Sequence, residues 1–310
     1  MTRILVTGGA GFIGFNFSKF AVSQGHEITV LDSLVGSNIS IDEIVQSEMK
    51  FIQHDIRDLD SLNTIDGQFD TIIHLAAQTS VQYSILHSKE TQEINVGGTD
   101  AVIRFAKRFN IGRIIIASSS AVYGDSKEQI HRVGCEGNQI SPYAATKFEN
   151  ETQVMECRKE GLEALALRFF NVFGPGQTST GAYAAVIPSF IEKISIGEPC
   201  IIFGDGLQTR DFIFVQDVIE LLLNLATISS LSPKNHVYNV GTGIGTTVMD
   251  IGAGISELLG FSEFNFITQP RREGDVVHSI ADISETEFDL NWKPRFSIKQ
   301  GLEQFVEQCS

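Results

Sequence analysis

Residues 3–14 read RILVTGGAGFIG, a short apolar run that passes directly into closely spaced glycines. Gly9, Gly11 and Gly14 fit the spacing GxGxxG, while Gly8, Gly11 and Gly14 fit GxxGxxG. A strand, a tight glycine turn and a following helix bring backbone N–H groups close to a pyrophosphate. The stretch therefore predicts a dinucleotide-binding βαβ unit at the start of the chain.

Short apolar runs alternate with helical patterns as far as residue 170, which is typical of βαβ units with buried parallel strands. The predicted fold is α/β, with a Rossmann-type doubly wound parallel sheet, and its ligands should lie at the carboxyl ends of the strands. The strand-like runs are 3–7, 27–32, 50–55, 70–77, 113–120 and 164–170, and the clearest helical stretches are 89–109 and 142–160.

Beyond residue 170 the pattern changes to shorter elements with more Gly and Pro. We expect a Rossmann domain over 1–170, to which a segment around 211–243 returns, because VYNV at 237–240 resembles another strand. A smaller C-terminal substrate-binding region should comprise 171–210 and 244–310. Helical patterns in this half of the chain cover residues 184–195, 217–227, 247–259 and 298–308.

Composition excludes several classes of function. The 310 residues carry a formal charge of −15 without a basic stripe, which argues against nucleic acid or a membrane surface as partner. No apolar run has transmembrane length and no signal peptide is evident, so we expect a cytoplasmic protein. The four cysteines are widely spaced and lack neighbouring histidines, so no metal site is expected.

The second strand-like run ends in Asp32, where a carboxylate would bind the adenosine ribose hydroxyls. The same charge repels a 2′-phosphate, so NAD is favoured over NADP as cofactor. A tight turn followed by an unrelated aspartate is the weaker alternative. Asp55 and Ile56, after the third run, should help complete the adenine and ribose pocket. Small residues after the fourth run should do the same, in the sequence His74-Leu75-Ala76-Ala77.

The fifth run ends in SSSAVYG at 118–124, and SPYAATK follows at 141–147. Ser141 and Pro142 suit a helix start, and Tyr143 and Lys147 would then share one helix face. A lone YxxxK is usually just a solvated helix surface. The upstream glycine loop and the strand-end serines are what favour an active site here.

The chain resembles the extended short-chain dehydrogenases/reductases, specifically their NAD-dependent nucleotide-sugar epimerases and dehydratases. The motifs are TGGAGFIG, HLAA, SSSAVYG, SPYAATK, LRFFNVFGP, FGDGLQTRDF, YNVGTG and RREGDVVHSIAD. The resemblance implies that Tyr143 is the acid/base, that Lys147 binds the nicotinamide ribose and lowers the Tyr143 pKa, and that Ser119 binds the sugar hydroxyl. The candidate cofactor-binding residues are Gly8, Gly11, Phe12, Ile13, Gly14, Asp32, Asp55, Ile56, Leu75, Ala76, Ala77, Asn95, Ser118, Tyr143 and Lys147.

The positions after Ser119 favour epimerisation over related reactions. The related 4,6-dehydratases carry an acidic pair there and the decarboxylases a glutamate at the second position, whereas this chain has Ser120 and Ala121. We therefore expect an isomerase that epimerises a UDP-hexose at C4, by transient oxidation to a 4-keto sugar. A dehydratase, decarboxylase or reductase, or a non-catalytic NAD-binding protein, remains the alternative.

The resemblance also implies residues that contact the UDP-sugar. Arg210 and Arg272 would bind the diphosphate; without the motif matches, surface ion pairs would be the default reading of two arginines in an acidic protein, and with them it is the weaker alternative. A small residue at Ser279 leaves room for an N-acetyl group, which predicts UDP-GlcNAc/UDP-GalNAc, with UDP-Glc/UDP-Gal as further substrates. The full set of expected substrate contacts is Ser119, Ser120, Asn171, Arg210, Arg272, Asp275 and Ser279.

Members of such families form homodimers through the two helices expected at 89–109 and 142–160. Ala101, Val102, Phe105 and Ala106 offer an apolar face for this, but the same pattern serves packing on the sheet. Precursors of cell-surface polysaccharides are a natural destination for the sugars, so a role in polysaccharide biosynthesis is expected.

Overall fold

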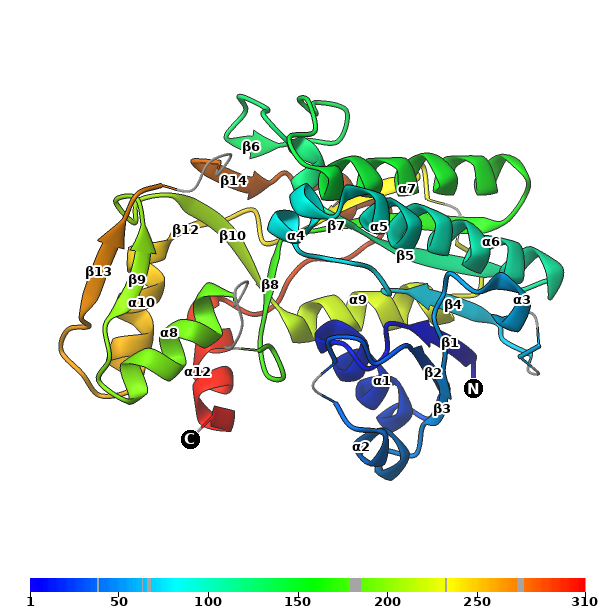
Figure 1. The fold of residues 1–310 in the computed structure, drawn as a ribbon, viewed down its shortest axis with the longest axis horizontal. Coiled ribbons are helices and arrows are strands. Elements are labelled where there is room, and N and C mark those ends of the chain that lie inside the picture. The colour runs from blue at the N-terminus through cyan, green and yellow to red at the C-terminus, as the bar shows by residue number, and fades with distance from the viewer. Residues whose placement is uncertain are drawn as a thin grey trace. The chain divides into compact units, whose positions relative to one another are not determined.

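The computed structural model describes residues 1–37, 39–62, 64–65, 68–178, 185–231, 233–271 and 276–309 (Figure 1). The chain forms two compact units that interleave along the sequence. The first comprises Met1–Gly124, Gly137–Arg168 and Ile219–Tyr238, and the second Asp125–Glu136, Phe169–Val218 and Asn239–Ser310.

The first unit is built on a seven-stranded sheet with the order β11-β7-β5-β4-β1-β2-β3. The five strands from β3 to β5 pair in parallel. The chain runs outward from β1 to β3 and then crosses back to β4, so the topological switch point lies between β1 and β4. The strands are β1 (Arg3–Thr7), β2 (Glu27–Asp32), β3 (Lys50–Gln53), β4 (Thr71–His74), β5 (Arg113–Ser119), β7 (Glu163–Phe169) and β11 (Val237–Val240).

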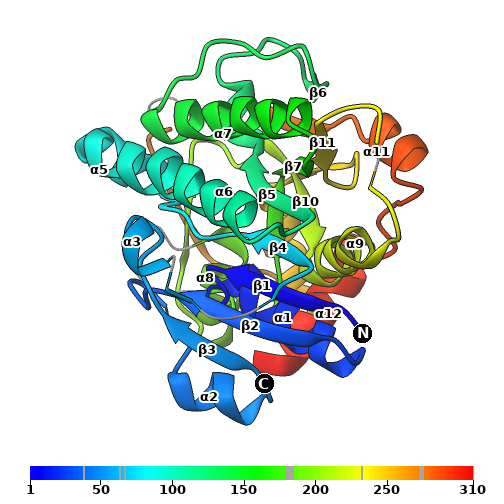
Figure 2. The same cartoon turned by 90° about the vertical axis from the view of Figure 1, so that its right-hand side faces the viewer.

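Helices cover both faces of this sheet, with α1 on one face and α6 and α7 on the other (Figure 2). Ile4, Leu5 and Val6 of β1 are fully buried, as expected for a parallel strand between two helical layers. The elements are α1 (Phe12–Ser23), α2 (Ile41–Gln46), α3 (Leu59–Leu62), α4 (Val81–Leu86), α5 (Ser88–Gln92), a π-helix (Glu93–Gly97), α6 (Gly98–Arg108), a 3₁₀ turn (Ser120–Tyr123), α7 (Pro142–Lys159) and α9 (Val215–Thr227).

The apolar face of α6 is used inside the unit. Ala101, Val102, Phe105 and Ala106 are each at most 5% exposed, and α6 contacts β4 and β5. Of the two uses that the pattern allowed, the structure confirms packing on the sheet for these four residues.

The second unit centres on β10 (Thr209–Phe214), which pairs in parallel with β8 (Asn171–Phe173) and β14 (His278–Ala281) and antiparallel with β12 (Gly245–Thr247). Asp211 of β10 is fully buried and accepts hydrogen bonds from the backbone N–H groups of Thr242, Gly243 and Ala281 at 2.7–3.1 Å. This carboxylate therefore ties β14 and the 242–243 loop to β10. The remaining elements are β6 (Ile130–His131), α8 (Val186–Ser195), β9 (Cys200–Phe203), α10 (Val248–Leu258), β13 (Phe266–Gln269), α11 (Ser284–Asp289) and α12 (Ile298–Cys309).

Candidate active site

The glycine loop between β1 and α1 forms a cradle that side chains would fill. A Cβ on Gly14 would lie 2.2 Å from the Gly8 carbonyl oxygen, and one on Gly8 would lie 2.6 Å from the Ala76 nitrogen. Gly8 also has a φ of +70°. Gly11 caps α1 without a side chain, and the N–H groups of Phe12 and Ile13 begin the helix without intrahelical acceptors. The loop therefore offers amides without intrahelical acceptors and a backbone without side chains at its glycines, which fit a pyrophosphate.

Asp32 stands at the carboxyl end of β2 beside this loop. Its Oδ2 accepts from the Ala10 N–H at 3.0 Å, and its Oδ1 accepts from the Leu34 N–H at 2.8 Å. These bonds fix the carboxylate, and each oxygen retains acceptor capacity for a ribose hydroxyl. The fit of this end of the site to the adenosine half of a dinucleotide is therefore chemical as well as steric.

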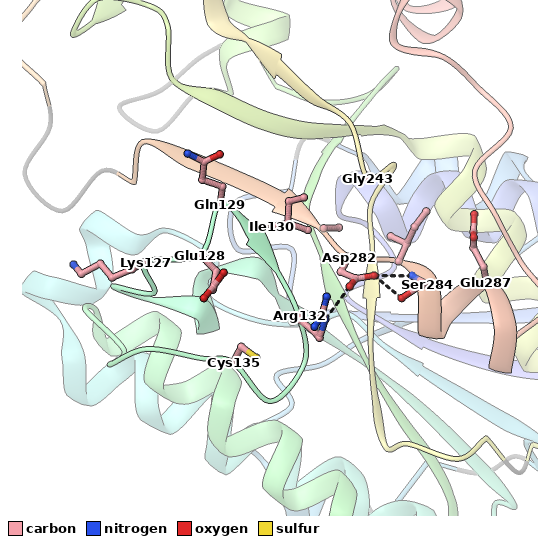
Figure 3. Close-up of a pocket in the computed structure, with 12 residues that line it drawn as sticks. Lys127, Glu128, Gln129, Ile130, Arg132, Cys135, Gly243, Asp282, Ser284 and Glu287 are labelled. Carbon is pink, nitrogen blue, oxygen red and sulfur yellow. Dashed lines mark hydrogen bonds and ion pairs between the residues drawn. The ribbon is translucent and has the colours of Figure 1, made fainter.

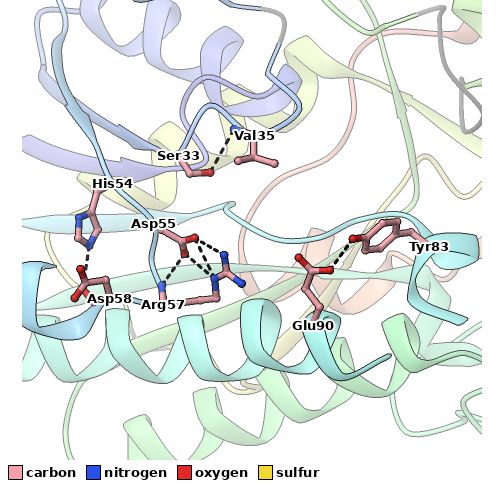
Figure 4. Close-up of polar contacts among 8 residues, drawn as sticks. All are labelled: Ser33, Val35, His54, Asp55, Arg57, Asp58, Tyr83 and Glu90. Carbon is pink, nitrogen blue, oxygen red and sulfur yellow. Dashed lines mark hydrogen bonds and ion pairs between the residues drawn. The ribbon is translucent and has the colours of Figure 1, made fainter. Parts of the chain in front are cut away.

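Asp55 and Ile56 lie beyond β3, where the sequence placed them. Arg57 holds the Asp55 carboxylate through Nε–Oδ1 at 3.0 Å and Nη2–Oδ2 at 2.6 Å (Figure 4). The side-chain hydrogen bond with Arg57 lowers the pKa of Asp55. Ile56 is 5% exposed and packs so closely on α6 that a Cβ on Gly98 would lie 2.5 Å from its Cδ1. Ile56 is thus packed into the interior against α6, while Arg57 holds the carboxylate of the neighbouring Asp55.

His74 belongs to a buried hydrogen-bond chain. The Thr99 hydroxyl donates to the Asn95 carbonyl oxygen at 2.5 Å, so it accepts from His74 Nε2 at 2.9 Å. His74 Nδ1 therefore accepts from the Thr7 hydroxyl at 2.6 Å. Burial, together with the charge of Lys147, lowers the pKa of His74 to about 3. His74 is therefore a neutral core residue that supports the loop.

Asn95 lies in the π-helix and is fully buried. Its Oδ1 accepts from the Gln78 N–H at 2.8 Å, and its Nδ2 donates to the Gln78 carbonyl and the Thr146 hydroxyl at 3.0 Å. Asn95 therefore joins the segment after Leu75-Ala76-Ala77 to the helix that carries Tyr143 and Lys147. A π-helical turn is often found at functional sites, and here it turns an amide into the core.

Tyr143 and Lys147 lie one turn apart on α7, which begins with the Ser141 cap and Pro142 as expected. Tyr143 is 8% exposed and Lys147 5%. Burial raises the pKa of Tyr143, and a hydrogen bond with Ser119 opposes this. Lys147 Nζ donates to the Ala117 carbonyl at 2.9 Å, and burial lowers its pKa to about 8. The structure thus brings Ser119, Tyr143 and Lys147 together at the end of β5.

Glu151 and Arg168 were missed by the sequence analysis. Both are at most 3% exposed, and Arg168 donates to Glu151 at 2.7 and 2.8 Å. Ser118 also donates to Glu151, at 2.5 Å, so this expected cofactor residue faces a carboxylate within the protein. The available signals were the spacing of Glu151, one turn beyond Lys147, and an arginine inside the apolar run 164–170.

The second unit holds three of the described candidates for substrate contact, whereas Ser119 and Ser120 belong to the first unit. Asn171 pairs with Phe212 between β8 and β10, and Arg210 pairs with Ser279 between β10 and β14, so one small sheet carries all three. Asn171 is exposed, Arg210 is half-buried and Ser279 is 5% exposed. Arg272 and Asp275 lie outside the described residues.

A hollow of about 870 Å³ lies in the second unit, lined by the segment 127–135, by Gly243 and by residues from the end of β14 to α11 (Figure 3). An ion pair between Arg132 and Asp282 crosses it at 2.9 Å. None of the site residues expected from the sequence lines it.

Among the described residues, no group of His, Cys, Asp and Glu could hold a metal ion. No helix in the described part of the chain is long and apolar enough to cross a membrane.

Comparison with known proteins identifies the family. The model of the NAD dependent epimerase/dehydratase family matches residues 4–241. The chain is 35% identical to a Methanocaldococcus jannaschii protein with a provisional UDP-glucose 4-epimerase name, over 98% of this chain and 97% of that protein. It is 29% identical to UDP-N-acetyl-alpha-D-glucosaminuronate decarboxylase of Bacillus cytotoxicus, over 98% and 97%.

A solved structure agrees with these relatives. UDP-N-acetylglucosamine 4-epimerase from Methanobrevibacter ruminantium M1, in complex with UDP-N-acetylmuramic acid, matches with a TM-score of 0.90 and 32% identity, over 99% of this chain and 97% of that one. The chain therefore belongs to the NAD-dependent epimerase/dehydratase family. Its fold is the Rossmann-like α/β fold of that family, and its cofactor is NAD.

Proposed function

We propose that this enzyme is an isomerase that reversibly epimerises a UDP-hexose at C4, with NAD bound tightly throughout the cycle. The observation that carries the proposal is the cluster of Ser119, Tyr143 and Lys147. The two positions after Ser119 are Ser120 and Ala121 instead of acidic residues. Elimination of water or decarboxylation needs a further acid or base beside the serine, and epimerisation does not.

The chain's own residues divide the work as follows. Bound NAD supplies the acceptor for the C4 hydride and returns it. Tyr143 removes the proton from the C4 hydroxyl as the hydride leaves C4, which together give a 4-keto sugar, and it returns the proton to the oxygen when the hydride is returned to the other face of the turned sugar. Ser119 binds the same hydroxyl, and Lys147 donates to the nicotinamide ribose. The amides of the glycine loop would hold the pyrophosphate, and Asp32 would hold the adenosine ribose.

Tyr143 needs help to act as a base near neutral pH. A fall of its pKa by roughly 3 units requires about 4 kcal/mol, and burial in the protein raises the pKa instead. One cation several ångströms away supplies on the order of 3 kcal/mol at an effective dielectric constant near 20. Lys147 and the positive nicotinamide ring together meet this requirement, whereas the Ser119 hydrogen bond alone does not.

The proposed substrates are UDP-GlcNAc and UDP-GalNAc, with UDP-Glc and UDP-Gal also turned over. We assign the diphosphate contacts to Asn171 and Arg210, with Arg272 and Asp275 as further contacts of the nucleotide. Ser279 is small and stands opposite Arg210 on β14, which supports space for an N-acetyl group. A Ser279→Tyr variant should lose UDP-GlcNAc turnover and keep UDP-Glc turnover, while Ser279→Ala should keep both.

The test is incubation of the purified protein, without added cofactor, with UDP-GlcNAc and separately with UDP-Glc, followed by NMR of the sugars. Galacto epimers should appear and should be lost in Tyr143→Phe. Tyr238→Phe is the matched control, because it also removes a phenolic hydroxyl; Tyr238 lies on β11, and its hydroxyl accepts a hydrogen bond from the Asn235 N–H. Loss of water or CO₂, or a net absorbance change at 340 nm, would instead show a dehydratase, decarboxylase or reductase. Unchanged sugars even with added NAD would refute the assignment.

We also propose that the protein is a cytoplasmic homodimer, in a route to cell-surface polysaccharide, that pairs through α6 and α7. Phe148 of α7 is 40% exposed and offers apolar surface there. Light scattering on the holoenzyme should give twice the monomer mass, and Phe148→Glu should reduce it to one. A monomeric wild-type protein would exclude the dimer.

A further inference from the structure

A buried ion pair stands directly behind the catalytic candidates. Glu151 extends from α7 and Arg168 from β7, and they are 3% and 2% exposed. Arg168 binds both carboxylate oxygens, with Nε–Oε1 at 2.8 Å and Nη2–Oε2 at 2.7 Å, and its guanidinium lies 4.8 Å from the Tyr123 ring centroid. A buried pair of this kind contributes little net stability compared with apolar side chains, so stability alone does not account for it.

Glu151 and Lys147, both on α7, form hydrogen bonds with the end of β5. Ser118 donates to Glu151 Oε1 at 2.5 Å, while the carbonyl of the preceding Ala117 accepts from Lys147 Nζ at 2.9 Å. Two side chains one helical turn apart therefore hold two consecutive residues of the strand. Ser119 is the next residue, so this double attachment determines where its hydroxyl lies relative to Tyr143.

Glu151 is the negatively charged group that acts on the Lys147 ammonium. His74 on β4 is neutral, Tyr143 lies on the same helix, and Glu151 is the anion whose charge favours the ammonium form. Arg168 partly neutralises Glu151, because it binds both of its oxygens. Burial of the ammonium opposes its charge, since it lowers the pKa of Lys147 to about 8.

We propose that Glu151 is a positioning residue that orients Ser119 through Ser118 and supplies the negative charge that stabilises the Lys147 ammonium, with Arg168 setting the strength of that charge. The inference rests on the proposed catalytic use of Ser119, Tyr143 and Lys147.

Opposite pH shifts distinguish this role from general damage to the fold. Glu151→Gln keeps the shape of the side chain and removes the anion that stabilises the Lys147 ammonium. The fall of kcat at alkaline pH, its alkaline limb, should therefore move down by about one to two pH units. Arg168→Met leaves the anion unneutralised and should move the same limb up. Arg168→Lys keeps the charge and should return the limb to its wild-type position. A loss of stability alone would shift the two charge-removing variants in the same direction.

The positioning part has its own variant. Ser118→Ala removes one hydrogen bond and leaves the Glu151 carboxylate paired with Arg168. It should lower kcat about tenfold, with KM and the pH at which kcat falls on the alkaline side unchanged. For Glu151→Gln the matched control is Glu163→Gln, because it removes the carboxylate of a second, partly buried ion pair of the same unit, with Arg113 at 2.5 Å. Its pH profile should follow the wild type.

The affinity for NAD, measured by calorimetry between pH 6 and 10, gives a readout that does not depend on turnover. Its alkaline decline should shift down in Glu151→Gln and up in Arg168→Met. If the wild type epimerises no UDP-sugar, the proposed function fails while this profile still tests the inference. Shifts in the same direction, or none, in folded variants would overturn the charge role. If Glu151→Gln or Arg168→Met does not fold, unchanged kcat in Ser118→Ala overturns the positioning role.

Discussion

Replacement of His74 by glutamine should remove a large part of the protein's sensitivity to acid. His74 is 2% exposed, its ring is neutral with both nitrogens hydrogen-bonded to threonines, and its pKa in the folded protein is about 3. In the unfolded chain it titrates near 6.5. Between these two pH values only the unfolded state binds the proton. The contribution of His74 to the free energy of unfolding is therefore fully present above about pH 6.5 and is lost as the pH falls toward 3.

The size of the effect follows from the two pKa values. One proton gives a slope of about 1.4 kcal/mol per pH unit, so the stability lost to protonation of His74 is about 2 kcal/mol at pH 5 and about 4 kcal/mol at pH 3, where the folded state also begins to bind the proton. Glutamine has no such titration, so the His74→Gln variant, although less stable at pH 7.5, should lose about 2 kcal/mol less than the wild type between pH 7.5 and 5.

Urea unfolding followed by circular dichroism at pH 7.5, 6 and 5 measures this difference. His54→Gln serves as the control, because His54 is only partly buried and bonds to the Asp58 carbonyl through one ring nitrogen, so it should follow the wild type. Equal losses of stability in the wild type and His74→Gln would refute the reasoning, since they would mean that His74 is protonated in the folded protein.

Three further predictions concern binding. Gly14→Ala places a Cβ 2.2 Å from the Gly8 carbonyl oxygen and should weaken NAD binding about 100-fold in calorimetry. Gly112→Ala, whose Cβ meets nothing within 4 Å, should leave the affinity unchanged. Equal affinities of the two variants would show that the glycine loop does not bind the cofactor. Asp32→Asn should weaken NAD binding about tenfold and reduce the discrimination against NADP, and an unchanged NAD to NADP ratio would contradict its assigned role. Arg210→Lys should raise KM for the UDP-sugar about tenfold with a smaller change in kcat, because one ammonium replaces a guanidinium fork; an unaltered KM would remove Arg210 from the diphosphate site.

The sheet of the first unit could be read from the sequence because its signals are local. The runs 3–7, 27–32 and 237–240 match β1, β2 and β11 to the residue, and the helical patterns 89–109 and 142–160 match the observed helices to within one residue at each end. The first of these helical segments contains a π-helical turn at Glu93–Gly97 that no pattern indicated. A buried parallel strand is apolar on both faces, so it is recognisable without knowledge of its neighbours.

The second unit was harder to read for the opposite reason. β6, β8, β12 and β14 have two to four residues each, and their partners are distant in the chain, such as Ile130 with Ile280. The segment Asp125–Glu136 joins this unit although it lies between two parts of the first, and it was expected within the Rossmann domain over 1–170. Short strands of this kind depend on pairing for their stability, so their own composition carries little signal.

The sequence by itself determined the glycine loop, the acidic end of β2 and the YxxxK helix, because each depends on residues only a few positions apart. Only the tertiary structure decided which polar groups are buried together. Glu151 reads as an ordinary helix-surface carboxylate until Ser118 and Arg168 are placed against it, and His74 becomes neutral only when Thr7 and Thr99 enclose it. Burial and the partners it supplies come from segments far apart in the chain, and they set the charge of an ionisable group.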